Sequence, residues 1–143
     1  DAAMTRAMMV TILWRMEKEP AALKSSFTDL TADWYRTAVD WAAETGVVNG
    51  VGNGKFAPNT ALSLEQLITI LYRYAENKGY NVSRSASLDP FTDGSAVSAY
   101  AKPAMQWAVG MNFLSGNTLT PGAPVSRAQI AQVLMLFCKA YIK

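Results

Sequence analysis

The chain has 143 residues, of which 50% are hydrophobic, a formal net charge of +2 and no histidine. This length suits one domain or a short repeat array with a sizeable core. Without histidine there can be no Ser-His or Cys-His nucleophile pair and no histidine-ligated zinc. No apolar run approaches the ~18 residues of a membrane span, so we expect no membrane insertion. Asp1 opens directly on a helical pattern, so we expect a mature or trimmed fragment without a signal peptide.

Basic side chains are unevenly distributed along the chain. Residues 94–143 contain four lysines or arginines and no acid, whereas residues 1–93 contain nine bases and eleven acids. An anionic partner is one interpretation, and a solvated basic face without a binding task is the other. The one cysteine, Cys138, lies in an apolar helical stretch. We expect a small buried thiol there rather than a reactive or metal-binding one.

The first predicted element is a helix whose start recurs twice later in the chain. Thr5, Ser63 and Ser126 each precede apolar residues at i, i+4 and i+7, which form one face of an α-helix. The matching sets are Met9, Leu13 and Met16, then Leu67, Leu71 and Tyr74, then Ile130, Leu134 and Phe137. We therefore predict three copies of one amphipathic helix.

These helices have a sequence signal at their starts. The hydroxyls of Thr5, Ser63 and Ser126 are placed to act as N-caps. Gln66 and Gln129, three residues after the serines, complete capping boxes. The first copy has Met8 at that position, so we expect its capping box to be incomplete.

After a polar linker at residues 17–26, a second predicted helix lies within residues 27–50. It aligns with residues 91–116, which follow another polar linker at 76–90. Each copy predicts a short helix that stops near glycine or asparagine. The aligned pairs are Phe27 with Phe91, Asp29 with Asp93, Trp34 with Tyr100, Trp41 with Trp107, and Gly50 with Gly116. The two aligned tryptophans share a stripe with alanines, so we expect Trp41 and Trp107 in the core, and we expect the aspartates to tie down the chain that enters each helix.

A turn with a proline follows each of these helices. Pro58 and Pro121 each stand five residues before the serine that begins the next helix. The same spacing from Thr5 places the first proline ahead of Asp1, so we expect a first repeat cut in half. The predicted boundaries are 1–20 for that half repeat, 27–78 for the second repeat and 91–143 for the third.

An arginine follows the cap in two of the three helix starts, as Arg6 and Arg127. A cation there opposes the helix dipole, at a cost of about 0.3 to 1 kcal/mol. One interpretation is that the long side chain leans into water. The other is that the guanidinium and the free N–H groups of the helix start bind a carboxylate or phosphate. Several modest sites of this kind would hold a polymer through avidity.

The ordered set of Phe-x-Asp, a Trp-containing helix, Gly-Val-Val-Asn-Gly, Phe-x-Pro and a Thr-Arg-Ala helix start resembles the S-layer homology (SLH) domain family over nearly the whole chain. The resemblance implies an all-α array of tandem helix-loop-helix repeats, packed with pseudo-threefold symmetry. It also implies non-covalent anchoring of a surface protein to a bacterial cell wall, and therefore an extracellular location. The family's ligand is a secondary cell-wall polysaccharide, often pyruvylated, which binds in grooves between neighbouring repeats.

The resemblance also suggests which residues would contact such a ligand. The motif arginine corresponds to Arg6 and Arg127, whereas the second copy has Leu64 followed by Glu65, so we expect a weak groove there. Trp34 and Tyr100 are aromatic residues that could stack on sugar rings, or simply support the fold. The remaining candidates are the residues at the glycine turns, Asn49, Gly50, Ser115 and Gly116.

Two other function classes are alternatives to a glycan-binding anchor. In the first, the domain is a structural or assembly module that self-associates through the truncated first repeat, whose lone helix must cover an apolar face. In the second it is an enzyme using Asp29 or Asp93, which requires an acid and a base about 5 to 10 Å apart. The sequence shows no such pair, so we expect no catalysis. We also expect no cofactor, no nucleic-acid partner and no metal, since Asp89 and Asp93 are too few ligands for calcium.

Overall fold

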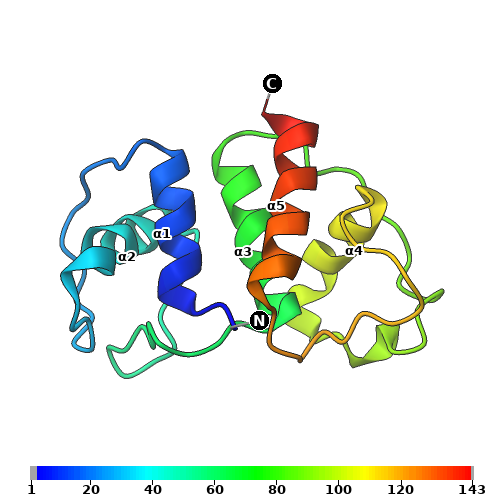
Figure 1. Cartoon of the computed structure of the whole chain (residues 1–143), viewed down its shortest axis with the longest axis horizontal. Coiled ribbons are helices and arrows are strands. Elements are labelled where there is room, and N and C mark those ends of the chain that lie inside the picture. Colours follow the sequence, from blue (N-terminus) through cyan, green and yellow to red (C-terminus); the bar gives the residue numbers. More distant parts are fainter. Residues whose placement is uncertain (1–2, 143) are drawn as a thin grey trace. The chain divides into compact units, whose positions relative to one another are not determined.

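The computed structural model describes residues 3–142, and their regular structure is helical. The helices are α1 (Arg6–Met16), α2 (Asp33–Thr45), α3 (Leu64–Asn77), α4 (Lys102–Gly110) and α5 (Arg127–Tyr141), with the short 3-10 turns η1 (Gly94–Ala96) and η2 (Ala99–Ala101) ahead of α4 (Figure 1). Between residues 3 and 142, β-type pairing is limited to isolated bridges. The predicted all-α class is confirmed.

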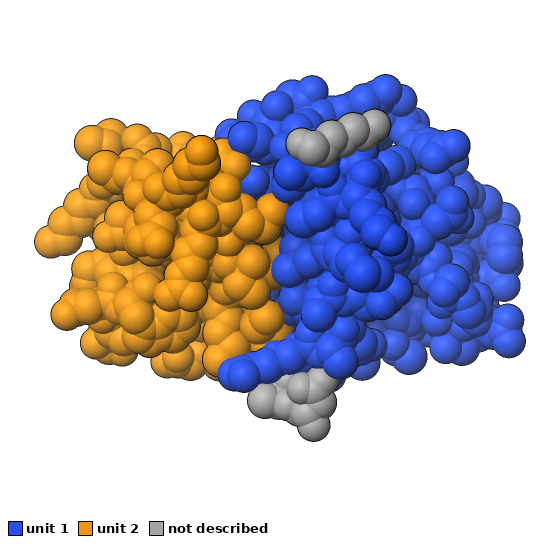
Figure 2. All heavy atoms as spheres, turned by 45° about the horizontal axis from the view of Figure 1, so that its top comes forward, with its two compact units in different colours: residues 1–3, 62–143 blue, residues 4–61 orange. Residues whose placement is uncertain are grey.

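The chain forms two compact units that do not follow the sequence repeats (Figure 2). One unit, residues 4–61, contains α1, α2 and the loop after α2. The other contains Ala3 together with α3, α4 and α5. The helix assigned by sequence to the first repeat therefore packs against α2 from the second repeat. The apolar face of this helix, for which a second molecule was one expected cover, is covered by α2 of the same chain.

The core of the 4–61 unit joins the apolar faces of α1 and α2. Met9 and Leu13 of the predicted α1 face are fully buried, and so is the neighbouring Val10, whereas Met16 is half-buried. Burial of each large apolar side chain contributes about 1.5 to 3 kcal/mol. Gly46 then ends α2 in the left-handed conformation, with φ of 80°. The buried residues from α2 and the loop include Tyr35, Ala38, Val39, Asp40, Trp41, Ala42, Val47, Val48 and Phe56.

The core of the α3–α5 unit is built around an aromatic cluster centred on Trp107. The Trp107 ring lies 5.3 Å from Phe113, 5.4 Å from Tyr72 and 6.3 Å from Phe137 between centroids. Its Nε1–H donates to the hydroxyl of Tyr141 at 3.0 Å, so the polar edge of the indole is satisfied. Since Trp41 is 5% exposed and Trp107 is 1% exposed, the prediction that both tryptophans are core residues is confirmed.

The caps form as predicted. Ser63 and Ser126 each make a complete capping box with Gln66 and Gln129. The Thr5 hydroxyl accepts a hydrogen bond from the N–H of Met8, and the methionine returns none. The capping hydrogen bonds at the three helix starts are therefore local in sequence.

Both polar linkers are tied down within the unit that contains them. The backbone N–H and the hydroxyl of Ser25 donate to the buried Asp40 carboxylate of α2. In the second linker, the Asn81 carbonyl accepts from the Tyr141 hydroxyl at 2.8 Å. None of the helices within residues 3–142 has the length and apolar character needed to cross a membrane.

Candidate functional site

The first turns of α1 and α3 are completed by backbone carbonyls from a loop about 55 residues further along the chain. In each case the loop ends at the predicted proline turn, and two carbonyls accept from the first two helical N–H groups. The bonds are Arg6 N–H to Thr60 O (3.0 Å), Ala7 N–H to Pro58 O (2.9 Å), Leu64 N–H to Ala123 O (3.1 Å) and Glu65 N–H to Pro121 O (3.0 Å). At α1 and α3 these N–H groups are thus engaged within the chain, so they are not available to a bound anion.

An aspartate clamps each of these loops. The Asp29 carboxylate accepts from the N–H groups of Phe56 and Ala57 at 2.9 and 2.8 Å. Burial raises the pKa of Asp29, but these two hydrogen bonds and the nearby Lys55 charge together lower it by more, and the resulting pKa lies below its ordinary value of 3.8. Asp29 stands in the segment that enters α2, so these bonds tie that segment down, as expected, and they tie it to the loop that follows α2.

The second clamp has the same geometry. The Asp93 carboxylate accepts from the N–H groups of Leu119 and Thr120, each at 2.8 Å, and these bonds lower the pKa of Asp93 below 3.8. Ala57 and Thr120, which occupy the same place in the two loops, both have positive φ, 60° and 47°. Non-glycine residues adopt this conformation at an energetic cost. The carboxylates therefore hold the loops in a shape that they would not favour alone.

The Arg6 guanidinium forms its hydrogen bonds within the 4–61 unit. Its Nε–H donates to Phe56 O at 2.9 Å, and its Nη2 donates to Asn49 O at 2.8 Å. The guanidinium lies 4.8 Å from the centroid of the Phe56 ring, a cation–π distance. Arg6 is only 8% exposed. The structure thus brings two predicted site residues, Arg6 and Asn49, into direct contact.

Leu64 holds the equivalent position in the α3–α5 unit, where the result is an open groove of about 410 Å³. The counterpart of Phe56 O is Leu119 O, which accepts from the Thr120 hydroxyl at 2.7 Å. Ser115, a predicted site residue, lies in this groove, and no charged side chain lines it. The lining is Leu64, Phe113, Leu114, Ser115, Thr118, Leu119, Thr120, Ala128, Gln129, Gln132 and Val133.

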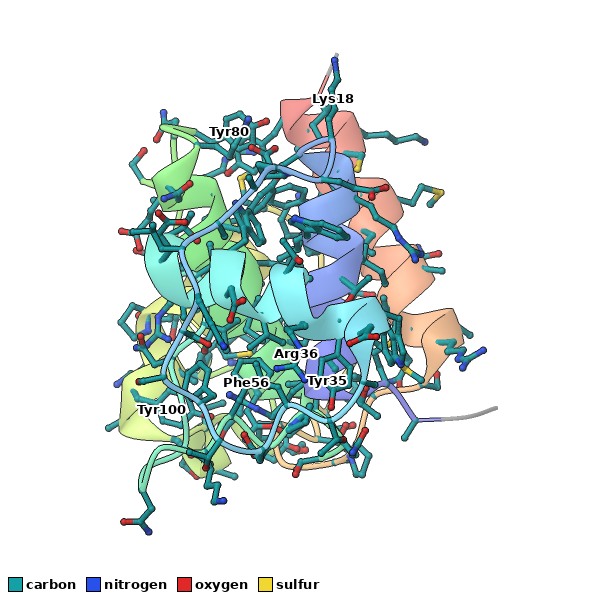
Figure 3. All side chains as sticks on the ribbon, turned by 90° about the vertical axis from the view of Figure 1, so that its left-hand side faces the viewer. Lys18, Tyr35, Arg36, Phe56, Tyr80 and Tyr100 are labelled. Atoms are coloured by element: carbon teal, nitrogen blue, oxygen red, sulfur yellow. The ribbon has the colours of Figure 1, made fainter. Side chains whose placement is uncertain are left out.

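Three other predicted residues are exposed but do not line this groove. Arg127 is exposed at the first position of α5, next to Ala128, which does line it. Trp34 is 50% exposed, and its ring meets Tyr35 edge-on at 5.0 Å. Tyr100 is 54% exposed, with its hydroxyl 3.5 Å from the Glu65 carboxylate. Figure 3 labels Tyr35 in the first turn of α2 and Tyr100 in η2.

The two predicted glycines have backbone roles. A Cβ at Gly50 would lie 2.5 Å from the Phe27 ring and 2.7 Å from the Lys55 carbonyl, so the close approach of the chain requires glycine. Gly116 adopts φ of 105°, a conformation that side-chain-bearing residues rarely take. Both shape the loops, and their role in ligand contact stays a prediction.

Glu65 is a residue whose role sequence reasoning missed. It is 7% exposed, and its carboxylate accepts from the N–H of Ser98 at 2.9 Å and from the Ser98 hydroxyl at 2.6 Å. These bonds hold the start of η2, which carries Tyr100. An acid in the first turn of a helix was the available signal, but its partner lies 33 residues away. Within residues 3–142, no group of three or more acidic or cysteine side chains could hold a metal ion.

Comparisons with known proteins give one family match and several relatives. A sequence model of the S-layer homology domain matches residues 26–68 and 90–131. An endoglucanase of Bacillus sp. (strain KSM-635) is 30% identical over 92% of this chain. The surface-layer 125 kDa protein of Lysinibacillus sphaericus is 31% identical over 90% of it, and the exoglucanase XynX of Acetivibrio thermocellus is 25% identical over 88%. The chain spans only 14%, 11% and 12% of the lengths of these proteins.

The aspartate clamps predict a dependence of stability on pH. Because the folded-state pKa values of Asp29 and Asp93 are lowered, their contribution is complete above the ordinary value of 3.8 and is lost as the pH falls through the lower folded-state values. We expect an Asp29→Asn, Asp93→Asn double variant to have a lower Tm at neutral pH and a flatter decline of Tm on acidification. Calorimetry over an acid pH series measures this, with exposed Asp89→Asn as the control. A double variant with the wild-type slope would contradict the clamp.

The environment of Arg6 predicts that the two motif arginines differ in their effect on stability. Arg6→Met leaves the Phe56 and Asn49 carbonyls without these donors, and we expect it to lower the free energy of unfolding by about 1 to 3 kcal/mol. The matched variant Arg127→Met alters an exposed side chain and should change stability by no more than ~0.5 kcal/mol. Urea unfolding measures both, and equal losses would show that Arg6 has no special structural role.

Proposed function

The chain belongs to the S-layer homology domain family, whose domains anchor proteins at the cell surface, and on that premise we propose a specific ligand and mode of anchoring. The module binds a secondary cell-wall polysaccharide that is anionic, with pyruvate ketals as the charged groups, and so holds its parent protein non-covalently on the bacterial cell wall. It performs no catalysis of its own. Any enzymatic activity of a longer protein would lie in other domains.

The observation that carries this proposal is the groove beside α5, together with the exposed arginine next to it. Ser115, Thr118 and Gln132 supply hydroxyl and amide groups that can exchange hydrogen bonds with sugar hydroxyls. Arg127 adjoins the groove-lining residue Ala128 in sequence, and its side chain is exposed. Polar groups above an apolar floor are the usual composition of a small-ligand site.

The anionic contact is assigned to Arg127 rather than to Arg6. Arg6 already satisfies two backbone carbonyls of its own unit, so a ligand carboxylate would have to displace them. Arg127 can approach a carboxylate with two of its three guanidinium nitrogens, a contact that contributes roughly 1.5 to 3 kcal/mol when well formed. This corresponds to about one to two decades of affinity. Half-exposed Trp34 and Tyr100 are the proposed stacking surfaces for other sugar residues.

A second candidate function, an assembly module, is favoured by an exposed face of α5. Counted from the capping residue of each helix, the first, second, fifth and sixth positions are buried on α1 and α3 but exposed on α5. Met135, one turn further along α5, is 46% exposed. A second copy of the chain is the proposed occupant, and it would meet α5 rather than α1. The positions are Arg6, Ala7, Val10 and Thr11 on α1, Leu64, Glu65, Ile68 and Thr69 on α3, and Arg127, Ala128, Ala131 and Gln132 on α5.

Cell-wall anchoring is tested by co-sedimentation with purified sacculi that retain their polysaccharide. We expect the wild type to pellet, and we expect sacculi stripped of the acid-labile polymer to leave it in solution. Arg127→Ala should weaken binding by about tenfold or more, because it removes a charge-assisted contact of roughly 1.5 to 3 kcal/mol. A tenfold change in affinity corresponds to about 1.4 kcal/mol. Lys139→Ala, which removes a cation from the last turn of α5, is the matched control. A chain that stays in solution with intact sacculi would refute the anchor.

Assembly is tested by sedimentation velocity over a concentration series. If α5 binds a second copy, the average sedimentation coefficient should rise with concentration, and Met135→Lys should abolish the rise by placing a charge in the contact. Leu23→Lys changes an exposed residue of the other unit and serves as the control. A coefficient independent of concentration would exclude this candidate.

A further inference from the structure

The segment that leads from the aspartate clamp to the next helix differs in length between the two units. Four residues separate Asp29 from Trp34, whereas six separate the aligned Asp93 from Tyr100. In the 4–61 unit the chain enters α2 directly, so Trp34 is the second residue of that helix. In the α3–α5 unit the turns η1 and η2 precede α4, and Tyr100 lies on η2. The two exposed aromatic residues are therefore carried by different backbone structures.

The entry to α2 is held by side chains of α2 itself. The Tyr35 hydroxyl accepts from the N–H of Thr31 at 3.0 Å, and Nη2 of Arg36 donates to the Leu30 carbonyl at 2.6 Å. In the third repeat the position aligned with Tyr35 is occupied by Ala101, whose side chain has no hydroxyl. The longer segment therefore cannot be held by the same contact.

Glu65 of α3 holds this longer segment instead. Its carboxylate accepts from the N–H of Ser98 at 2.9 Å and from the Ser98 hydroxyl at 2.6 Å, and the Tyr100 hydroxyl lies 3.5 Å from it. Hydrogen bonds to a carboxylate are roughly twice as strong as those between neutral groups. A single 3-10 turn has few hydrogen bonds of its own, and their geometry is poorer than in an α-helix. The start of η2 therefore depends on Glu65.

Glu65 has no equivalent at the other two helix starts. The aligned residues are Ala7 on α1 and Ala128 on α5, and an alanine side chain cannot accept a hydrogen bond. The acid occurs only on α3, the helix that contacts η2. Two departures from the repeat pattern, the acid on α3 and the two additional residues before Tyr100, thus meet in one set of hydrogen bonds.

The Glu65 carboxylate is not placed to contact a ligand itself. Glu65 is only 7% exposed, and both of its carboxylate oxygens are engaged by Ser98. It does not line the groove beside Leu64. Tyr100, in contrast, is 54% exposed. Glu65 can therefore act on a ligand only through the segment that it holds.

We infer that Glu65 is the positioning residue for the ligand contact of Tyr100. An acid from the second repeat thereby fixes the aromatic surface of the third repeat. The inference rests on the proposed stacking of Tyr100 on a sugar and adds the residue that orients this contact. Glu65 then contributes to binding from outside the groove beside Leu64.

NMR spectroscopy of the full chain without ligand tests the positioning. We expect Glu65→Ala to raise the hydrogen-exchange rate of the Ser98 amide by about tenfold or more and to lower the heteronuclear NOE of the Tyr100 amide. The Thr120 amide, which Asp93 holds in the same unit, is the internal control and should not change. Glu65→Gln can still accept from the Ser98 N–H, so it should keep most of the protection. An unchanged Ser98 amide in Glu65→Ala would overturn the inference.

A double-mutant cycle, measured by co-sedimentation with sacculi, tests the effect on the ligand. We expect Tyr100→Ala and Glu65→Ala each to weaken binding by about twofold to tenfold, the range for one aromatic contact. The double variant should lose no more than Tyr100→Ala alone, because both changes remove the same contact. Glu65→Gln should bind nearly like the wild type.

The control for the cycle is Glu76→Ala, which removes an exposed acid from the same helix and should bind like the wild type. Additive losses in the double variant would overturn the inference, since they would show that Glu65 does not act through Tyr100. Wild-type binding by Glu65→Ala would overturn it as well.

The two measurements keep this inference distinct from the anchor proposal. Co-sedimentation of the wild type, together with an unchanged Ser98 amide in Glu65→Ala, would overturn only the role of Glu65. A wild type that stays in solution, together with the expected change at Ser98, would refute the wall anchor and limit Glu65 to a role in the fold.

Discussion

The structure depends on hydrogen bonds that complete one helix with the carbonyls of a distant loop. The first N–H groups of an α-helix have no partners within the helix. A capping hydroxyl at Thr5 or Ser63 satisfies one of them, and the loops ending at Thr60 and Ala123 satisfy two more. Each helix start therefore needs the following half repeat to be folded and in place. This explains why the compact units cross the sequence repeats.

Holding those loops in shape is the task of Asp29 and Asp93. A carboxylate that accepts two consecutive backbone N–H groups stabilises a left-handed residue, Ala57 or Thr120, against its intrinsic preference. The two clamps have the same hydrogen-bond geometry, although the side chains around them differ. Arg6 and Leu64 show the result. The Arg6 guanidinium bonds to the Phe56 and Asn49 carbonyls beside the first clamped loop, whereas Leu64 lines a groove beside the second.

The position of Arg6 resolves an electrostatic difficulty in the sequence. A cation at a helix start opposes the helix dipole, so its presence there calls for a compensating interaction. Two carbonyl oxygens and the face of Phe56 provide that compensation within the protein itself. An arginine at this position can therefore serve the fold, as Arg6 does. Arg127 is exposed and differs from Arg6 in its surroundings, although the two residues follow the same kind of cap.

The sequence by itself determined the features that depend on neighbouring residues. It predicted the N-caps of Thr5, Ser63 and Ser126, the helical faces, and the burial of Trp41 and Trp107, because caps and amphipathic periods are local properties. The ordered motifs also predicted the family. Only the tertiary structure decided where Arg6, Asp29 and Glu65 direct their polar groups, because their partners lie 27 to 50 residues away. No local pattern encodes such partners, so the groove beside Leu64 becomes visible only when the loop and the helices are assembled.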